Sequence, residues 1–380
     1  MINHLRFMSQ FFLPNVDSVA LFSESMTLLK VEGKKAESFL SPIHAARFVA
    51  QYLPLQSGDW VALNDGLGGS TCPFGINLIG RYQSIIWSVR LTNVGLWKDS
   101  EKWDSMGFRL PPLPLKMQGK MNSQVPAKFL NIVQPFCDRV APSISKLEKY
   151  IDWNQKDFSK KNFELYLEKT EKKLRELLKD NPWLDQTAKA RTSSGEIISL
   201  NISFTDQAAI VDLSGTSPSK KIELNEKITD SIIVYGFLMA LKNFELYNGA
   251  NEKFFQVIKP TQCWLNSKEP KLPMHSHFIS APFLMSHMKQ LLLKLKLPVE
   301  GWNCSLDGFT QFEAADGSHW TNNQILQNTW GKGSPLFNAH KAAPGGIELL
   351  TQVDLSYMRV QAGSIEVGQL EKGNTWSLQL

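Results

Sequence analysis

The strongest periodic pattern in this chain spans residues 140–181 and predicts two consecutive helices near the middle of the sequence. In the first helix, apolar residues recur at steps of four, three and four, as on one buried helix face: Val140, Ile144, Leu147 and Ile151. In the second helix, the same spacing runs from Phe163 to Leu177, and Asp180-Asn181-Pro182 ends it. A helical hairpin of this kind would divide the chain into two parts.

Both flanking parts are rich in strand-like segments. Residues 15–95 contain several short apolar runs bounded by Gly, Asn or charged residues, with one helical segment around 45–52. Apolar and polar residues alternate over 198–204, as in a half-buried strand, and a second strand over 208–213 follows. Residues 228–244 are apolar nearly all round, which is typical of a buried helix.

These patterns predict an α+β (mixed α/β) fold in three parts. Residues 1–135 form a β-rich part, 136–185 the helical hairpin, and 186–380 a mixed α/β part with further buried helices. The prolines within 107–115 remove hydrogen-bond donors and fix φ, so this segment is predicted to be an extended connector rather than regular structure. A chain of 380 residues is long enough for two cores, or for one large core with a subdomain.

Composition and charge exclude several classes of protein. The chain has 43% hydrophobic and 20% charged residues, and its net charge of +5 is spread without the dense basic block typical of nucleic-acid binding. No apolar run approaches the roughly 18 residues of a membrane span, and the N-terminus lacks the features of a signal peptide. The cysteines form no close pair: Cys72, Cys137, Cys263 and Cys304. This spacing favours a reducing compartment, so we expect a cytoplasmic protein without nucleic-acid or membrane partners.

A glycine-rich loop after a predicted strand is the first place to look for a functional site. The strand Trp60–Leu63 leads into Asn64-Asp65, and Gly66-Leu67-Gly68-Gly69 follows. Glycine is common where a backbone takes positive φ or where a ligand approaches it closely. The spacing is not that of a dinucleotide-binding loop, and Gly331-Lys332-Gly333-Ser334 lacks the P-loop spacing, so we do not expect this chain to bind a nucleotide.

Three other features have both a functional and a structural interpretation. The segment Asp212–Pro218 follows a strand and supplies several hydroxyls, either for a ligand or for a Ser/Thr turn stabilised by its own side chains. His275 and His277 would point to one face of an extended segment, either as two metal ligands or as surface or packing residues. His44, shortly before the glycine loop, is either a base or ligand or a packing residue.

In their order along about residues 15–300, these motifs resemble the hydantoinase B/oxoprolinase family, the B-type subunit of ATP-dependent hydantoinases, 5-oxoprolinases and acetone carboxylase-like enzymes. The family stretch GDxxxxNDPYxGGTHxPD is similar to the run that contains Gly58-Asp59, Asn64-Asp65 and Gly68-Gly69. The family signature DFSGTSPQ is similar to Asp212–Ser219, and its PxNxG motif to Tyr247-Asn248-Gly249. The chain is identified as a shortened and divergent member of this family.

The resemblance implies a hydrolase-type subunit that acts on a cyclic amide of the hydantoin or 5-oxoproline class. It implies an oligomer with an actin-fold ATPase subunit of the hydantoinase A type, which binds ATP and phosphorylates the substrate, and a divalent metal as cofactor. Of the matching residues, His44 and Asp65 are the catalytic candidates. The implied substrate-binding residues lie in the matching loops: Asn64, Gly68, Gly69, Asp212, Ser214, Gly215, Thr216, Asn225 and Asn248.

The chain departs from the family pattern at the positions that the resemblance makes metal ligands. The His and Asp of GGTHxPD fall on Thr71 and Phe74, and the family segment AHHxDIGG falls near Ser88–Gly95, which has no histidine. A hydroxyl and a phenyl ring cannot replace imidazole and carboxylate as ligands of a divalent ion. No metal ligand is therefore assigned, and the alternative hypothesis is a catalytically degenerate member that serves as a non-catalytic subunit or ligand-binding module.

Overall fold

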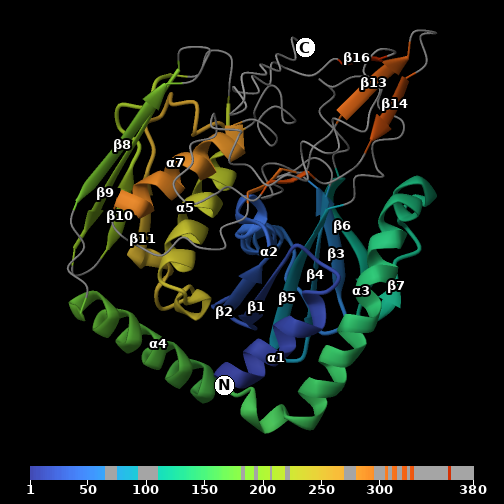
Figure 1. The fold of residues 1–380 in the computed structure, drawn as a ribbon. Coiled ribbons are helices and arrows are strands. Elements are labelled where there is room, and N and C mark those ends of the chain that lie inside the picture. The colour runs from blue at the N-terminus through green and yellow to red at the C-terminus, as the bar shows by residue number, and fades with distance from the viewer. Residues whose placement is uncertain are drawn as a thin grey trace.

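The computed structural model describes most of the first 294 residues and five short strands after them. The described ranges are 1–64, 75–92, 110–180, 185–191, 196–205, 208–218, 223–268, 280–294, 304–306, 310–314, 319–322, 326–328 and 358–360. Helices and strands are both abundant, so the predicted α+β fold class is confirmed (Figure 1). The division into parts at 135 and 185 stays a prediction.

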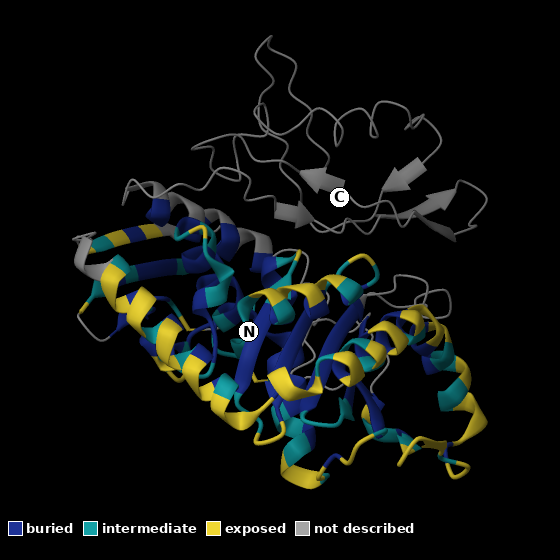
Figure 2. Ribbon diagram, turned by 90° about the horizontal axis from the view of Figure 1, so that it is seen from below, coloured by how far each residue is buried: buried dark blue, intermediate teal, exposed yellow. Residues whose placement is uncertain are grey.

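A seven-stranded antiparallel sheet forms the centre of the N-terminal part, with strand order β2-β1-β5-β4-β3-β6-β7. Its strands are β1 Ser18–Ser23, β2 Leu28–Gly33, β3 Trp60–Asn64, β4 Gly75–Tyr82, β5 Ile85–Thr92, β6 Leu110–Met117 and β7 Lys120–Met121. Its central strands are buried on both faces (Figure 2). Helices must therefore cover both sides of this sheet.

Alternating side chains of the sheet enter two different cores. On β3, Trp60 and Ala62 pack with the helices α1 (Ile2–Phe12) and α3 (Ala127–Trp153). Val61 and Leu63 face the opposite way and pack in the core that contains α2 (Ser41–Tyr52). The side-chain period of two thus decides which residues of each strand can reach α2.

The second part is a four-stranded sheet packed on two helices. Its strand order is β11-β10-β9-β8, with β10 and β11 parallel and the other pairs antiparallel. The strands are β8 Gln186–Arg191, β9 Ile197–Phe204, β10 Ala209–Asp212 and β11 Phe255–Ile258, and the helices are α5 Glu226–Ala240 and α7 Ala281–Lys294. The strands and the buried helix predicted over 198–244 are confirmed. Within the described residues, no helix is both long and apolar enough to cross a bilayer.

Short elements complete the described chain. The 3-10 helices are η1 Ala36–Ser38, η3 Gln155–Asp157, η4 Phe244–Leu246 and η5 Glu252–Phe254. Five short strands follow α7: β12 Cys304–Leu306, β13 Thr310–Ala314, β14 His319–Asn322, β15 Leu326–Asn328 and β16 Met358–Val360. β12 pairs with β15, and β13 lies between β14 and β16.

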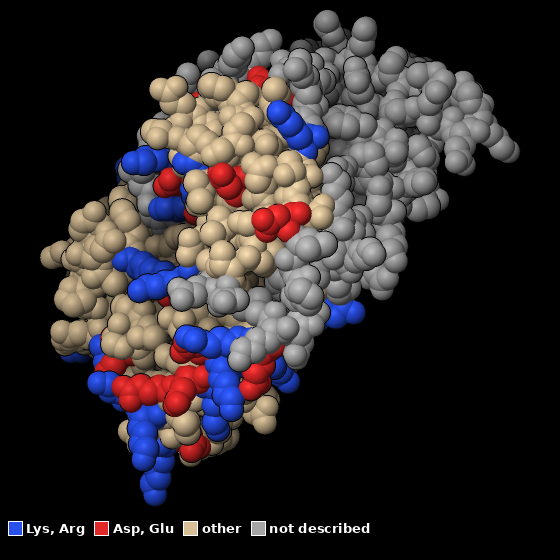
Figure 3. Space-filling view, turned by 90° about the vertical axis from the view of Figure 1, so that its left-hand side faces the viewer, with Lys and Arg blue, Asp and Glu red and all other residues tan. Residues whose placement is uncertain are grey.

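Both helices predicted near the middle of the chain are present, and each packs against a different part of the molecule. α3 packs on α1, whereas α4 (Lys160–Asp180) diverges from α3 and runs toward the second sheet (Figure 1). α3 begins earlier than the pattern predicted, because Pro135 lies inside it and is usually a sign that no helix continues there. Basic and acidic side chains mix on the outer surface around α4, as on a solvated helix face (Figure 3).

One prediction about regular structure is corrected, and one helix was not predicted. The proline-rich segment is not an irregular connector, because β6 covers Leu110–Met117 and pairs with β3. Prolines are accommodated there because β6 bonds β7 only at Lys116 and Met117, and the register with β3 is irregular. The helix α1 was missed, although Leu5, Met8 and Phe12 recur at helical spacing and are fully buried.

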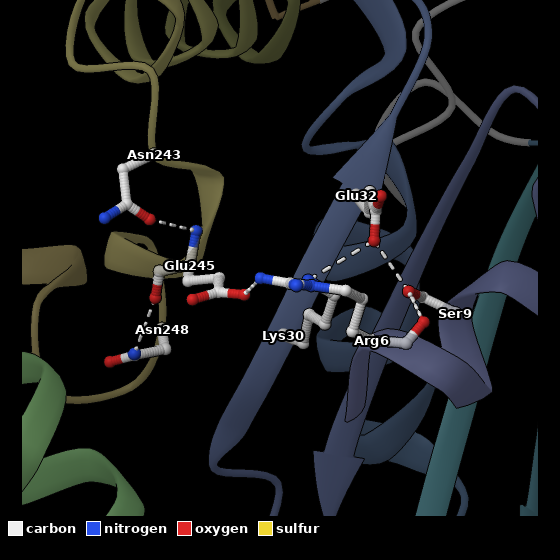
Figure 4. A network of polar contacts seen from close by, with 7 residues as sticks. All are labelled: Arg6, Ser9, Lys30, Glu32, Asn243, Glu245 and Asn248. Atoms are coloured by element: carbon white, nitrogen blue, oxygen red, sulfur yellow. Dashed lines mark hydrogen bonds and ion pairs between the residues drawn. The ribbon is translucent and has the colours of Figure 1, made fainter. Parts of the chain in front are cut away.

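A polar network joins α1 and β2 to the second part (Figure 4). Arg6 on α1 forms an ion pair with Glu245 of η4. Glu32 on β2 accepts a hydrogen bond of 2.6 Å from the hydroxyl of Ser9 and lies 3.3 Å from the ammonium group of the buried Lys30. These contacts hold the segment around η4 against the edge of the first sheet.

Gly58 and Asp59 form a tight connection at the start of β3. Gly58 has φ +90°, and a Cβ atom there would lie 2.7 Å from the backbone nitrogen of Gly119. The buried carboxylate of Asp59 accepts hydrogen bonds from the backbone N–H of Gln56 at 2.8 Å and of Gln118 at 2.6 Å. This part of the family-like motif therefore ties the start of β3 to the β6–β7 turn.

We expect Asp59→Ala to lower the free energy of unfolding by about 2–3 kcal/mol, because it leaves two N–H groups without their charged acceptor. Urea unfolding of the variant and the wild type measures the difference. Asp138→Ala, at an exposed carboxylate that bonds Gln134 on the same helix, is the matched control and should change stability by about 0.5 kcal/mol or less. Equal effects of the two substitutions would contradict a structural role for Asp59.

Candidate functional site

The strand β3 ends at Asn64, where the glycine loop begins. Asn64 is buried, with 3% of its surface exposed, and is opposite Leu110 on β6. The predicted site residues Asp65, Gly68 and Gly69 lie outside the described residues, as do Thr71 and Phe74. Their roles stay predictions, while Asn64 fixes the place in the fold from which the loop starts.

A group of buried polar side chains lies at the same end of the sheet. Asn77 on β4 is opposite both Leu63 on β3 and Arg90 on β5, and it is fully buried, as is Arg90. The hydroxyl of Ser41, in the first turn of α2, donates to Oδ1 of Asn77 at 3.2 Å. This contact brings the N-terminus of α2 to the end of the sheet where Asn64 lies.

The sequence motifs do not include these residues as ligand-binding candidates. They could have been found from the sequence, because Asn77 and Arg90 lie inside otherwise apolar strands. Polar side chains are costly in such strands unless they have a specific partner. Ser88 on β5 is a third such position, and it is also fully buried. Asn77, Ser88 and Arg90 therefore extend the candidate site beyond the glycine loop.

His44 lies on α2, one turn after Ser41, and its Nε2 atom is buried without a hydrogen-bond partner in the described part of the chain. Burial is the main cause that lowers the pKa of His44 to about 3. The positive charges of Lys227, Arg47 and Lys259 lower this pKa further, in that order of effect. The imidazole is therefore neutral near pH 7 and is better suited to hydrogen bonding than to accepting a proton.

The cations around His44 are held by acids on neighbouring elements. Lys259 donates to both carboxylate oxygens of Asp230 on α5 at 2.7 Å, and Arg47 pairs with Glu252 at 2.7 Å. Burial raises the pKa of Asp230, although Lys259 opposes this shift. His44 thus lies at the junction of α2, α5 and the segment after β11, in a mainly positive local field.

The hydroxyls of the segment 212–218 mostly bind backbone groups of β9. Thr216 Oγ1 accepts from the backbone N–H of Ser199 at 3.0 Å and donates to its carbonyl at 3.1 Å. The Ser217 hydroxyl accepts from the N–H of Ile197 at 2.7 Å. Gly215 takes φ +92°, and the carboxylate of Asp212 accepts from the N–H of Ser214 at 2.8 Å. These contacts support the structural interpretation of this turn and leave the exposed Ser214 hydroxyl available.

The remaining predicted ligand-binding residues, Asn225 and Asn248, also make structural contacts. Asn225 caps α5, because its side-chain oxygen accepts from the N–H of Lys227 at 2.9 Å. The fully buried Asn248 donates to the hydroxyl of Thr170 on α4 at 2.8 Å and to the carbonyl of Glu245 at 3.1 Å. These contacts support structural roles for both side chains.

The described residues do not fit the divalent metal that the family resemblance implies. No three His, Cys, Asp or Glu side chains of the described ranges come together in a way that could hold a metal ion. Among the described residues at the end of β3–β5, the buried guanidinium of Arg90 has no lone pair to give to a metal ion. His275 and His277 lie outside the described residues, so their metal-binding interpretation stays a prediction.

Comparison with known proteins identifies the fold. No protein-family model matches the chain, and no curated protein matches it either. The structure is similar to the ATP-dependent caprolactamase from Pseudomonas jessenii, with a TM-score of 0.63 and 15% identity over 86% of this chain and 64% of that one. It is also similar to a nucleotide-free acetone carboxylase, with a TM-score of 0.63 and 11% identity over 93% of this chain and 56% of that one. The chain thus shares their fold and spans about 64% and 56% of their lengths.

We expect Thr216→Val to lower the free energy of unfolding by about 1–3 kcal/mol, because it leaves the buried N–H of Ser199 without an acceptor. Ser214→Ala removes a hydroxyl of the same turn that is exposed, and should change stability by about 0.5 kcal/mol or less. Chemical unfolding measures both variants. If Thr216→Val were as stable as the wild type, the turn would not depend on this hydroxyl.

The low pKa of His44 makes stability depend on pH in a defined direction. The pKa of His44 is near 6.5 in the unfolded chain and about 3 in the folded chain, so between these pH values the unfolded chain binds a proton that the folded chain does not. The contribution of His44 to stability is therefore complete above pH 6.5 and is lost as the pH falls. We expect the loss of unfolding free energy between pH 7 and pH 5 to be about 2 kcal/mol smaller in His44→Gln than in the wild type. Urea unfolding at the two pH values is the measurement. Identical pH dependence would show that His44 titrates normally.

Proposed function

We propose that this chain is a substrate-binding component of an ATP-dependent enzyme that acts on cyclic amides, and that it belongs to the hydantoinase B/oxoprolinase family. The observation that carries the proposal is the fold, which is shared with an ATP-dependent caprolactamase over 86% of this chain. The order of the motifs along the sequence supports the same family. Because the identity is 15%, the substrate and the reaction rest on the site rather than on the likeness.

The proposed substrate site lies where β3 ends in Asn64 and the glycine loop begins. In this proposal the buried amide of Asn64 would hydrogen-bond a ring carbonyl or N–H, and the backbone of Gly68-Gly69 would allow close approach of the ring. Asp65 is the remaining acid/base candidate. His44 would serve as a neutral hydrogen-bonding group, because its low pKa makes it a weak base at neutral pH.

The low reactivity of an amide toward water explains why the chain would need an ATP-binding partner subunit. An unstrained amide resists attack by water, and transfer of a phosphoryl group to its oxygen would create a better leaving group. The sequence of this chain has neither a P-loop nor a dinucleotide-binding loop. We therefore propose that ATP is bound by a separate actin-fold ATPase subunit of the hydantoinase A type, in an oligomer with this chain.

A second candidate function is a non-catalytic subunit or ligand-binding module of the same family. Two observations favour it: Thr71 and Phe74 replace the family's implied metal ligands, and the Thr216 and Ser217 hydroxyls are used to hold β9. Such a module would bind a ligand or a partner without opening the ring. An adjacent gene for an actin-fold ATPase would favour the enzyme over the binding module.

The direct test is an assay of ring opening by the chain with and without its ATPase partner, using caprolactam, hydantoin and 5-oxoproline, together with elemental analysis of the purified protein. We expect ATP-dependent turnover of at least one substrate only when both subunits are present. Asp65→Asn should reduce kcat by about 100-fold or more, the usual contribution of a general acid or base.

Arg139→Gln, at an exposed position of α3, is the control for that variant and should leave turnover unchanged. Absence of turnover for all three substrates in the complete complex would contradict the enzymatic proposal. Ligand binding without turnover in the same preparations would favour the binding module.

A further inference from the structure

The outer surface of α1 and α3, which lie side by side, carries a continuous strip of aromatic side chains (Figure 1). On α1, His4, Phe7 and Phe11 follow at steps of three and four, so they share one face of the helix. The centroid of the Phe7 ring lies 4.8 Å from that of Phe11 and 5.0 Å from that of Tyr150 on α3. Tyr150 and Trp153 are three residues apart on α3, so their side chains are neighbours. We call these five residues the aromatic strip.

Two rings of the aromatic strip are open to solvent. Trp153 has 81% of its surface exposed, and Phe7 has 46%. The faces of α1 and α3 that pack on the sheet are made by other residues, and these are fully buried: Leu5, Phe12 and Leu147. A single exposed apolar residue is common, but a connected exposed surface of this kind indicates an interaction site. Trp and Tyr are also among the residues that contribute most to the affinity of protein interfaces.

The charges beside the aromatic strip are of both signs. Lys146 and Lys149 lie one turn before its two residues on α3, and both are exposed. At the other end of the strip, a carboxylate oxygen of Asp157 lies 3.7 Å from Nε2 of His4, and 52% of the Asp157 side chain is exposed. Lys156 next to it is exposed as well. A surface of one sign would favour a partner of opposite charge and repel its own copy, whereas a surface of both signs can pair with itself.

We propose that the aromatic strip is the interface of a two-fold dimer, in which it packs on the same strip of a second copy of this chain. In a two-fold interface the same surface patch is used by both copies. With the two α3 helices antiparallel, the Lys146 end of one strip lies beside the Asp157 end of the other, and the aromatic rings meet between these ends. α1 and α3 cover the face of the first sheet opposite α2, so the inference stands independently of the proposed function.

The test is sedimentation equilibrium of the full chain over a series of concentrations, which gives its mass in solution and the dissociation constant of the dimer. We expect the mass of two chains at micromolar concentration. Trp153→Ser should fold, because the side chain is exposed, and should weaken the dimer by about tenfold or more, because each copy loses an interface Trp. Tyr52→Ser is the matched control: Tyr52 lies on α2, outside the strip, and is 70% exposed, so its loss should leave the dissociation constant unchanged.

A second pair of variants tests the arrangement of the two copies. Lys146→Glu should weaken the dimer severalfold, because it places a negative charge beside Asp157 of the second copy. Lys128→Glu changes an exposed lysine of the same helix about 27 Å away and should have no effect. Equal dissociation constants for these two variants would contradict the antiparallel arrangement.

Two outcomes would overturn the proposal as a whole. One is a chain that stays monomeric over the whole concentration series, or a dimer whose dissociation constant is the same in Trp153→Ser and the wild type. The other is a monomer that binds phosphatidylserine vesicles and loses this binding in Trp153→Ser, which would assign the aromatic strip to a lipid surface instead.

Discussion

The contact between α2 and α5 is the packing interaction on which the rest of the structure depends. α2 covers one face of the seven-stranded sheet and α5 supports the four-stranded sheet, so their contact joins both sheets into one continuous apolar core. A buried hydroxyl fixes this contact: Ser231 on α5 donates to the carbonyl of Ala36 at 2.6 Å and accepts from the N–H of Leu40 at 3.0 Å. Because these bonds hold the start of α2, they also set where Ser41 and His44 lie relative to the first sheet.

The polar group at the end of the first sheet gains its properties from this burial. In a medium of low polarity, buried polar groups such as the amide of Asn77 and the guanidinium of Arg90 interact more strongly with their partners than they would at the surface. Burial has the opposite effect on His44, whose pKa falls to about 3 and whose imidazole stays neutral. The described residues at this end of the sheet are therefore better suited to hydrogen bonding than to holding a divalent metal.

Sequence patterns predicted the strands and helices whose apolar residues form a regular pattern. The alternation over β9, the apolar run of α5 and the helical spacing of α4 all correspond to observed elements. Prolines obscured the start of α3 and the strand β6, because Pro135 is accommodated inside α3 and Pro114 lies in β6 opposite Val61. Local patterns cannot show such accommodation, since it depends on neighbouring strands and helices.

The candidate site was less predictable than the fold. Motif resemblance selected Thr216 and Asn248, but their side chains are committed to backbone and helix contacts, which only the three-dimensional structure reveals. Arg90 and Asn77 were missed because they belong to separate strands that become neighbours only through sheet register. The most direct measurement of the central claim is a crystal structure of the protein grown with a cyclic amide such as caprolactam. We predict the ring amide within hydrogen-bond distance of Asn64, at the end of β3. A ring bound elsewhere on the protein, or no bound ring at a saturating concentration, would contradict the claim.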